Sequence, residues 1–301
     1  MFKQQRTHAE NAEEVPVMSP SDIPLIVRLA SSTDYRLVGR LCRRAVGPGD
    51  YVLEILKQVI ADKGLFLACS NDQPVGMVNF EKCVDGSGWL GMARTDPDWR
   101  RRGVALFLQQ QVAVHARKRG IKHLRLWVLS KNRPSLLAAK KGGFRPVCEA
   151  THVSCSVRVK RGRRQITTFR LISRKTLKSL LRSPYLLKMN GYFAYKWHFV
   201  KASEELLDKL VGKGELHTDG ESSFIFTQPE MSYGDPYSAF ALLRGSTASI
   251  LKQVEEVAQG YGRLFLGCYL PYDSHLLPIA QKNGFRRDSW GKHCIVFEKK
   301  I

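Results

Sequence analysis

The segment with the clearest chemical potential is the turn from Asp96 to Ala105, which contains three consecutive arginines. It lies between a predicted strand over Trp89–Thr95 and a predicted helix over Ala105–Arg119. A turn that leads into a helix N-terminus presents backbone N–H groups to an anion. Gly103 and Ala105 have little or no side chain, so a diphosphate can approach the backbone closely. These residue types predict a site for a phosphorylated ligand.

The same segment resembles a known motif. The GNAT N-acetyltransferases carry a P-x-x-[RQ]-x-x-G-x-[GA] signature that binds the pyrophosphate of coenzyme A. Its fixed positions are filled here by Pro97, Arg100, Gly103 and Ala105. Further along the chain, the segment Asn132–Phe144 resembles the family's N-x-x-A-x-x-L-Y-x-K-x-G-F motif. The resemblance covers about residues 20–172 and implies an N-acetyltransferase that uses acetyl-CoA as cosubstrate.

The resemblance also implies roles for individual residues. Ala93 and Thr95, with Arg94 between them, should offer backbone groups to the pantetheine arm at the splayed end of the fourth strand. Asn132 should lie beside the same arm. The diphosphate should be held at one continuous run, which comprises Arg100, Arg101, Arg102, Gly103, Val104 and Ala105. The alternative for the three arginines is a solvated basic turn or a nucleic-acid patch.

One position departs from the family's pattern. Where the family often has a Tyr that protonates the departing thiolate, this chain has Ala139. Another group acts as the acid, solvent assists the thiolate, or the domain has lost turnover. Transfer to an amine also requires a neutral amine, and therefore a base. Glu81 is the first candidate and Asp85 the second, and the alternative for each is a carboxylate on a surface hairpin. His115 and Cys83 are expected to be surface or packed side chains.

The elements around these residues predict a mixed α/β sheet with a crossover in its middle, as the GNAT fold requires. Hydrophobic periodicity and turn residues locate each element. Helices are predicted over 21–31, 35–45, 52–62, 105–119, 135–141, 174–187, 203–211, 247–259 and 274–282. Strands are predicted over 64–70, 75–84, 89–95, 123–129, 144–159, 165–172, 192–200, 222–227, 238–243, 263–270 and 294–298.

The second half repeats the order of the first. The pair Gly143-Phe144 recurs as Gly284-Phe285, after a short helix in each case, which indicates two copies of one module. The diphosphate signature is missing from the second copy, because Arg244–Ala248 stands where it should be. We therefore expect a degenerate second domain. The plan is similar to that of tandem GNAT proteins of the histidine N-acetyltransferase type, through Gly47-x-x-Asp50-Tyr51 and Phe169–Ile172, and the likeness is too faint to carry over the acceptor.

Three regions follow from this pattern. Residues 1–16 are expected to be a disordered lead-in, residues 17–173 a GNAT domain with the acetyl-CoA site, and residues 174–301 a degenerate GNAT-like domain. No apolar run reaches the ~18 residues of a membrane helix, and no signal or transit peptide is recognisable. We expect a cytoplasmic protein with no membrane contact.

The composition adds two expectations. The seven cysteines never occur in CxxC spacing and the eight histidines do not cluster, so reduced packed thiols are predicted and no metal site. The formal net charge of +21 attracts anions, among them coenzyme A with its three phosphates. Arg158–Arg164 and Arg174–Arg182 concentrate charge near the domain junction, next to aromatic residues 192–199. This junction is the alternative site for a nucleic acid, in a chain that has kept the fold and weakened its turnover.

Overall fold

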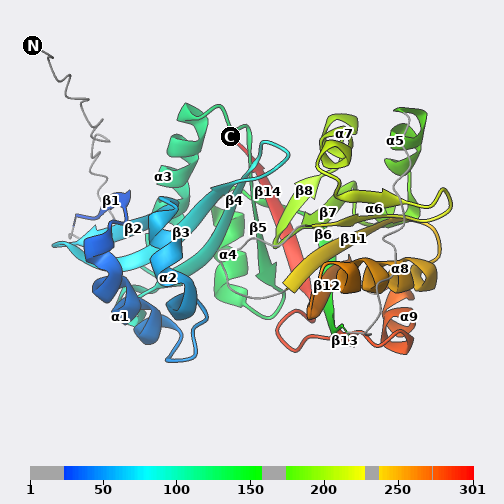
Figure 1. The fold of residues 1–301 in the computed structure, drawn as a ribbon. Helices are drawn as coiled ribbons and strands as arrows, with labels where there is room; N and C mark the ends of the chain where they lie inside the picture. Colours follow the sequence, from blue (N-terminus) through cyan, green and yellow to red (C-terminus); the bar gives the residue numbers. More distant parts are fainter. Residues whose placement is uncertain (1–23, 158–173, 228–236, 273) are drawn as a thin grey trace, which may run out of the picture. The chain divides into compact units, whose positions relative to one another are not determined.

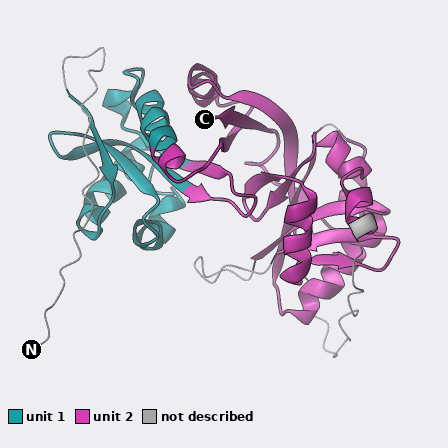
Figure 2. Cartoon of the chain, turned by 90° about the horizontal axis from the view of Figure 1, so that it is seen from above, with its two compact units in different colours: residues 1–80, 92–114 teal, residues 81–91, 115–301 magenta. Residues whose placement is uncertain are grey.

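The computed structural model describes residues 24–157, 174–227, 237–272 and 274–301 (Figure 1). The chain divides into two compact units (Figure 2). Unit 1 comprises residues 1–80 and 92–114, and unit 2 comprises residues 81–91 and 115–301. The chain passes from one unit to the other within three elements: β3 (Gln73–Lys82), β4 (Gly88–Thr95) and α3 (Val104–Lys118).

Unit 1 contains an antiparallel arrangement of β1, β2 and β3, in which β2 is central. The helices α1 and α2 contribute one apolar face each to a core that also contains buried side chains of the strands. Apolar residues three and four positions apart produce these faces. The elements named here are β1 (Ile26–Leu29), α1 (Tyr35–Ala45), α2 (Val52–Ala61) and β2 (Leu65–Ser70).

The prediction of a helix over 21–31 is wrong for its described part. Residues Ile26 to Leu29 form β1, which pairs antiparallel with β2. A segment this short has too few turns for the helical period to be distinguished from the strand period. Its β-branched residues fit a strand, and the Arg28 guanidinium forks onto the Asp34 carboxylate at 2.7 and 2.8 Å.

Unit 2 is built on one mixed sheet, in the order β4-β5-β14-β6-β12-β11-β10-β9. The pairs β4–β5 and β11–β12 are parallel, and the others in this order are antiparallel. A short strand, β13 (Arg286–Arg287), also pairs with β6. The strands are β5 (His123–Leu129), β6 (Arg145–Ser156), β9 (Leu216–Thr218), β10 (Ser223–Phe226), β11 (Tyr237–Arg244), β12 (Phe265–Pro271) and β14 (Cys294–Lys300).

The last strand of the chain lies between two strands from its first half. Residues of β14 pair with β5 from Cys294↔Leu129 to Lys300↔His123, and with β6 from Cys294↔Ala150 to Glu298↔Arg145. The sequence predicts this strand, but in the second domain. The two predicted halves therefore share one sheet, completed by the end of the chain.

The aromatic segment over 192–200 forms two strands and not the single one predicted. The strands β7 (Tyr192–Tyr195) and β8 (His198–Lys201) make an antiparallel hairpin, with Lys196 at φ 58° in the turn. Six of its aromatic and apolar side chains, including Phe199 and Val200, join the main core of unit 2. The helices of this half are α5 (Arg174–Leu180), α6 (Pro184–Lys188), α7 (Glu204–Gly212), α8 (Thr247–Gly260) and α9 (Leu276–Lys282).

Several predictions fall outside the described residues. These are the lead-in over 1–16, the strand over 165–172 and the basic turn over 158–164. The boundary between residues 173 and 174 adjoins the same gap and stays a prediction. Most of the remaining predicted helices and strands are confirmed within two residues of their ends, including α4 (Arg133–Lys141). The predicted helix over 174–187 is instead two helices, α5 and α6, and the predicted strand over 144–159 is β6 as far as Ser156, with residues 158 and 159 outside the described residues.

Candidate active site

Side chains of two arginines and two aspartates fix the start of the predicted diphosphate turn. Asp96 begins a short 3₁₀ helix, Pro97–Trp99, and its Oδ1 accepts the N–H of Asp98 at 3.0 Å. The Arg44 guanidinium of α1 donates to Asp96 at 2.7 and 3.0 Å and to Asp98 at 2.7 Å. Arg100 donates to the carbonyl of Ala45 at 2.8 Å. These contacts anchor the start of the turn to the end of α1.

The second part of the turn is open to solvent. Arg101 and Gly103 have φ angles of 64° and 81°, the left-handed region that a chain reversal needs. Arg101, Arg102 and Gly103 are exposed, and a Cβ at Gly103 would meet no atom within 4 Å. The helix α3 begins at Val104, and the N–H groups of its first turn have no partner inside the helix. The turn and the helix start thus present donors around an open space, which fits a bound diphosphate.

A glycine on the neighbouring strand sets the position of this helix start. A Cβ at Gly76 of β3 would lie 2.4 Å from Cγ1 of Val104 and 3.3 Å from Cδ1 of Leu108. Real Cβ contacts of 2.4 Å do not occur, so a side chain at this position would push the helix away. Gly76 therefore allows α3 to pack directly on the strand.

On β4, the strand predicted to contact the pantetheine arm, the Arg94 side chain forms a structural ion pair. The Arg94 guanidinium forks onto the buried Asp50 carboxylate, with both N···O distances 2.7 Å. Burial alone would raise the pKa of Asp50, but the hydrogen bonds and charge of Arg94 hold it below its ordinary value. Arg94 also donates to the carbonyl of Ala93 at 3.0 Å. The arginine side chain thus ties β4 to the loop before α2, and only its backbone is left for a cofactor.

The ladder between β4 and β5 is short. Its pairs are Gly88↔Leu124 and Trp89↔Arg125, both near the beginning of β4. Three residues later, Met92 has a φ of 54°, which interrupts the regular strand immediately before Ala93. This irregularity agrees with the predicted splay, where the backbone of Ala93 and Thr95 was expected to serve the ligand.

Two residues of the second motif occupy structural positions. Asn132 is the N-cap of α4, because its side-chain Oδ1 accepts the N–H of Ser135 at 3.2 Å. Ala139, at the family's Tyr position, is buried with 1% of its surface exposed. The buried methyl group cannot donate a proton. Asn132 lies in unit 2, and the residues from Ala93 to Ala105 lie in unit 1.

The first candidate base has a partner from the second half of the chain. The Oε2 atom of Glu81 lies 3.4 Å from Nε2 of His198 on β8. The His198 ring also lies against the ring of Trp89 at a centroid distance of 5.3 Å. The Glu81 side chain is 33% exposed, so solvent and small molecules can reach it. The pair combines two groups that can accept a proton.

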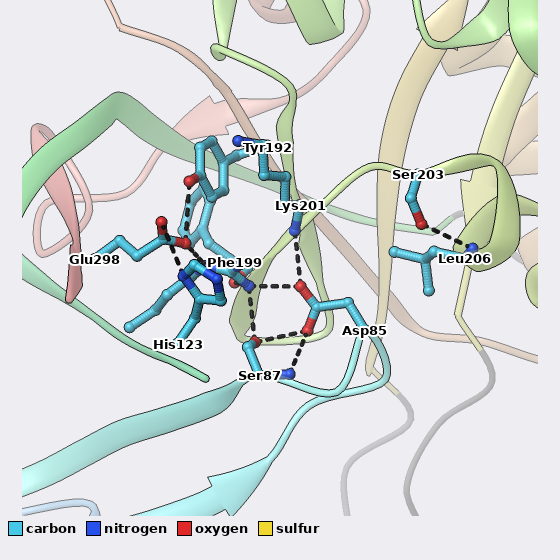
Figure 3. Close-up of polar contacts among 10 residues, drawn as sticks. Asp85, Ser87, His123, Tyr192, Phe199, Lys201, Ser203, Leu206 and Glu298 are labelled. Atoms are coloured by element: carbon cyan, nitrogen blue, oxygen red, sulfur yellow. Dashed lines mark hydrogen bonds and ion pairs between the residues drawn. The ribbon is translucent and has the colours of Figure 1, made fainter. Parts of the chain in front are cut away.

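The second candidate base, Asp85, already accepts hydrogen bonds from several donors. Asp85 receives hydrogen bonds from Arg125 at 2.5 Å, from the hydroxyl of Ser87 at 2.6 Å and from the N–H of Lys201 at 3.0 Å (Figure 3). Burial would raise the pKa of Asp85, but the charge of Arg125 and these donors hold it below its ordinary value. Such a carboxylate is a weak base near neutral pH.

The remaining candidates behave as the sequence predicts. Cys83 is buried, and burial raises the pKa of its thiol to about 12, so it is not a nucleophile. His115 is partly buried, and burial followed by the charges of Arg119 and Lys118 lowers its pKa. All seven cysteines are free.

Within the described ranges, no three His, Cys, Asp or Glu side chains gather as metal ligands, and no helix is long and apolar enough to cross a membrane.

The sequence did not reveal three of these partners. Arg44, Asp50 and His198 hold Asp96, Arg94 and Glu81, respectively. Each pair joins residues at least 44 positions apart, and no spacing pattern links them. Asp50 did carry a signal, since it belongs to the Gly47-x-x-Asp50-Tyr51 segment, but its partner was not predictable.

Comparison with known proteins gives one family. Residues 40–144 match the model of the acetyltransferase (GNAT) family. No protein in the curated comparison matches the chain. The fold is that of several solved structures that extend over both halves of the chain.

Three of these structures illustrate the likeness. A provisionally assigned acetyltransferase from Thermoplasma acidophilum has a TM-score of 0.57 and 17% identity, over 91% of this chain and 99% of its own. One from Pyrococcus horikoshii, equally provisional, has a TM-score of 0.54 and 16% identity, over 99% and 94%. A GCN5-related N-acetyltransferase from Sphaerobacter thermophilus has a TM-score of 0.54 and 13% identity, over 92% and 95%. At these identities the likeness concerns the fold, and the mixed sheet is compatible with two tandem copies.

Proposed function

We propose that this chain is a GNAT-family N-acetyltransferase, which binds acetyl-CoA at its domain over residues 40–144 and transfers the acetyl group to a primary amine. The observation that carries the proposal is the open turn before α3. The backbone at Gly103 has open space beside it, the N–H groups of the first turn of α3 follow directly, and the exposed side chains of Arg101 and Arg102 add positive charge. A diphosphate needs this combination.

When bound, acetyl-CoA supplies an activated acyl group as a thioester. The chain's own groups then bind and orient it. The N–H groups of the turn hold the diphosphate, and the backbone of Ala93 and Thr95 pairs with the pantetheine arm. Asn132 uses its Oδ1 as the cap of α4, which leaves its Nδ2 donor available to a ligand.

The acceptor requires a proton acceptor. A primary alkyl amine has an ordinary pKa near ~10.4, so it arrives protonated at neutral pH. Glu81 is the proposed base, and His198 at 3.4 Å shares the proton. Asp85 is unsuited, because Arg125 holds the pKa of its carboxyl low.

The departing thiolate needs less help than the amine. An ordinary thiol has a pKa of ~8.5, so a thiolate is a tolerable leaving group near neutral pH. A buried Ala139 is therefore compatible with turnover in which solvent protonates the sulfur. The same observation favours a second candidate function, an acyl-CoA-binding protein that turns over slowly.

Calorimetric titration with acetyl-CoA tests the cofactor site. Gly103→Glu should abolish binding, because it places a carboxylate where the diphosphate is expected. Gly120→Glu is the matched control, since Gly120 ends the same helix, has a φ of 72° and has open space around its Cβ position. Both variants carry the same strain and charge. Equal affinity of the wild type and Gly103→Glu would overturn the proposed site, and absence of wild-type binding would overturn the proposed function.

Screening of primary amines with acetyl-CoA then separates the two candidate functions. An enzyme should release free thiol at a rate that saturates with one amine class. If acetyl-CoA binds and no amine accelerates thiol release, the slow acyl-CoA-binding protein is correct. With an active amine, Glu81→Gln should lower kcat by about 10²–10⁴-fold. Glu149→Gln, from the carboxylate–histidine pair Glu149–His293 at 2.6 Å, should leave kcat unchanged.

A further inference from the structure

A stretch of fifty residues at the end of the first half contains no acidic residue. Between Trp99 and Cys148 there is no Asp and no Glu, in a chain that has 27 of them. The lysines and arginines of the same stretch are Arg100, Arg101, Arg102, Arg117, Lys118, Arg119, Lys122, Arg125, Lys131, Arg133, Lys140, Lys141 and Arg145. The three at the diphosphate turn and the buried Arg125 have roles already described. Most of the others have none.

Several of these cations gather at one place in unit 2. They come from the end of α3, the residue before β5 and the last turn of α4, and Lys299 of β14 lies among them. We call this set the basic face. Its members are Arg117, Lys118, Arg119, Lys122, Lys140, Lys141 and Lys299, of which all except the half-buried Lys299 are exposed.

Lys299 connects the three elements. In the β14–β5 register it lies opposite Leu124, two residues after Lys122. Its Cε lies 3.6 Å from the Cβ position of Gly143, which follows Lys140 and Lys141, and its Nζ lies 5.9 Å from the ring centre of Phe144. Neighbouring residues of a strand point to opposite faces. Glu298 therefore points away from Lys299, toward Tyr192 and His123 (Figure 3).

The neighbouring cations contribute, after burial, to the lowered pKa of two titratable groups. Burial and then the charge of Arg117 lower the pKa of Lys299. Burial and then the charges of Arg119 and Lys118 lower the pKa of His115. Within the described part of the chain, no ion pair joins a member of the basic face to a carboxylate.

Helix dipoles account for only a small part of this arrangement. Cations at a helix C-terminus are favourable, because the end of a helix carries about −0.5 charge. The ends of α3 and α4 together supply about −1. Seven cations exceed this by about six charges, so the basic face serves something other than capping.

We propose that the basic face is a docking surface for the phosphate backbone of a nucleic acid. A protein partner would need an apolar centre in its interface. Among the described residues, the exposed large hydrophobic side chains nearest to the basic face in sequence are Val114 and Leu137, each about one helical turn before the cations of α3 and α4, and none falls within 115–122, 140–145 or 298–300. A phosphate backbone needs cations alone, and such contacts are independent of base sequence. This proposal does not depend on the acetyl-transfer site.

Fluorescence anisotropy with a labelled 20-base-pair DNA duplex and a labelled 20-nucleotide RNA tests the proposal, in KCl from 50 to 200 mM. The test variant is Lys118→Glu/Lys122→Glu/Lys140→Glu. The control is Lys63→Glu/Lys252→Glu/Lys282→Glu, which changes the net charge equally at exposed lysines elsewhere. We expect the test variant to weaken binding of at least one probe by more than about tenfold at 100 mM KCl. Its slope of log K against log[KCl] should be about 3 smaller than that of the wild type.

The control variant should weaken binding by less than about threefold, because its charges lie away from the phosphates. Equal weakening by both variants would show a response to net charge and overturn the proposal. Lack of wild-type binding to both probes at 50 mM KCl would also overturn it. A competition experiment gives a third outcome that would overturn the proposal. If polyglutamate displaces the probe as effectively per charge as unlabelled duplex does, an acidic protein is the better candidate for the partner. Glutamine versions of the test variant, which avoid new acidic contacts, should weaken binding in the same direction.

Discussion

Arg125 donates its Nε–H to the carboxylate of Glu298 at 2.7 Å, across 173 residues of sequence. The same guanidinium pairs with Asp85 at 2.5 Å and lies 5.2 Å above the ring of Tyr192. Arg125 is 3% exposed. One buried cation thus joins the loop after β3, the strand β5, the aromatic hairpin and the last strand of the chain.

Removal of this cation should be costly. Arg125→Met would leave Asp85 and Glu298 without their main partner in a buried setting, and loss of one member of a buried pair costs about 3–5 kcal/mol. Urea unfolding measures the change. Arg145→Met, which replaces an exposed arginine of β6, should change stability by less than about 0.5 kcal/mol. A loss below about 1 kcal/mol for Arg125→Met would show that water replaces the guanidinium.

The contact between Gly76 and Val104 predicts a compensating pair of substitutions. Gly76→Ala adds a Cβ that would lie 2.4 Å from Val104 Cγ1, so it should destabilise the protein by about 1–3 kcal/mol and weaken acetyl-CoA binding. Val104→Ala removes that Cγ1. The double variant should therefore be more stable than the sum of the single effects, as a double-mutant cycle measures. Strictly additive effects would contradict the assigned contact.

His217 predicts a loss of stability in acid. The ring is 1% exposed and stacked on Phe224 at 5.0 Å, and burial lowers its pKa from 6.5 to about 4. Between pH 6.5 and 4 this histidine is protonated in the unfolded chain and neutral in the folded chain. The free energy of unfolding is therefore highest above pH 6.5 and decreases as the pH falls toward 4, by about 3 kcal/mol at ~1.4 kcal/mol per pH unit. His217→Phe should flatten the pH dependence of unfolding between pH 6.5 and 4, and an unchanged slope would contradict the assignment.

The cysteines predict slow thiol chemistry. Burial raises the pKa of Cys83 and of Cys148 to about 12, and only Cys155 is partly exposed. A thiol reagent at pH 8 should modify the native protein slowly, first at Cys155, and all seven sites after addition of urea. Cys83→Ser should keep any acetyltransferase activity within about threefold. A rapid reaction at Cys83 in the native protein would reopen its role as a nucleophile.

The local structure around the predicted diphosphate turn was predictable from sequence because its signals are local. Pro97, Gly103 and the helix start at Val104 lie within eight residues, and the structure places them as turn and helix N-terminus. The hairpin of β2 and β3 and the helices α1, α2 and α3 follow from periodicity and turn residues alone. The short segment Ile26–Leu29 failed this test, since pairing with β2 outweighed its apparent helical spacing.

Partner choice was not predictable. The sequence identified Glu81 as a candidate base, but His198 reaches it only because residues 192–201 fold into a hairpin. It also left Asp85 open as a base, until Arg125 was found to hold its carboxyl. In both cases a distant side chain decides what a carboxylate can do.

By itself the sequence predicted most helices and strands, the turn before α3 and a resemblance to the family whose model matches residues 40–144. Only the tertiary structure decided where β14 lies, between β5 and β6, and which side chains meet Glu81, Arg94 and Arg125. The physical reason is that periodicity states which face of a strand is apolar, while every strand offers the same backbone N–H and C=O groups to a neighbour. The choice among neighbours is made by burial and charge pairing across the whole sheet, as Glu298 does with Arg125.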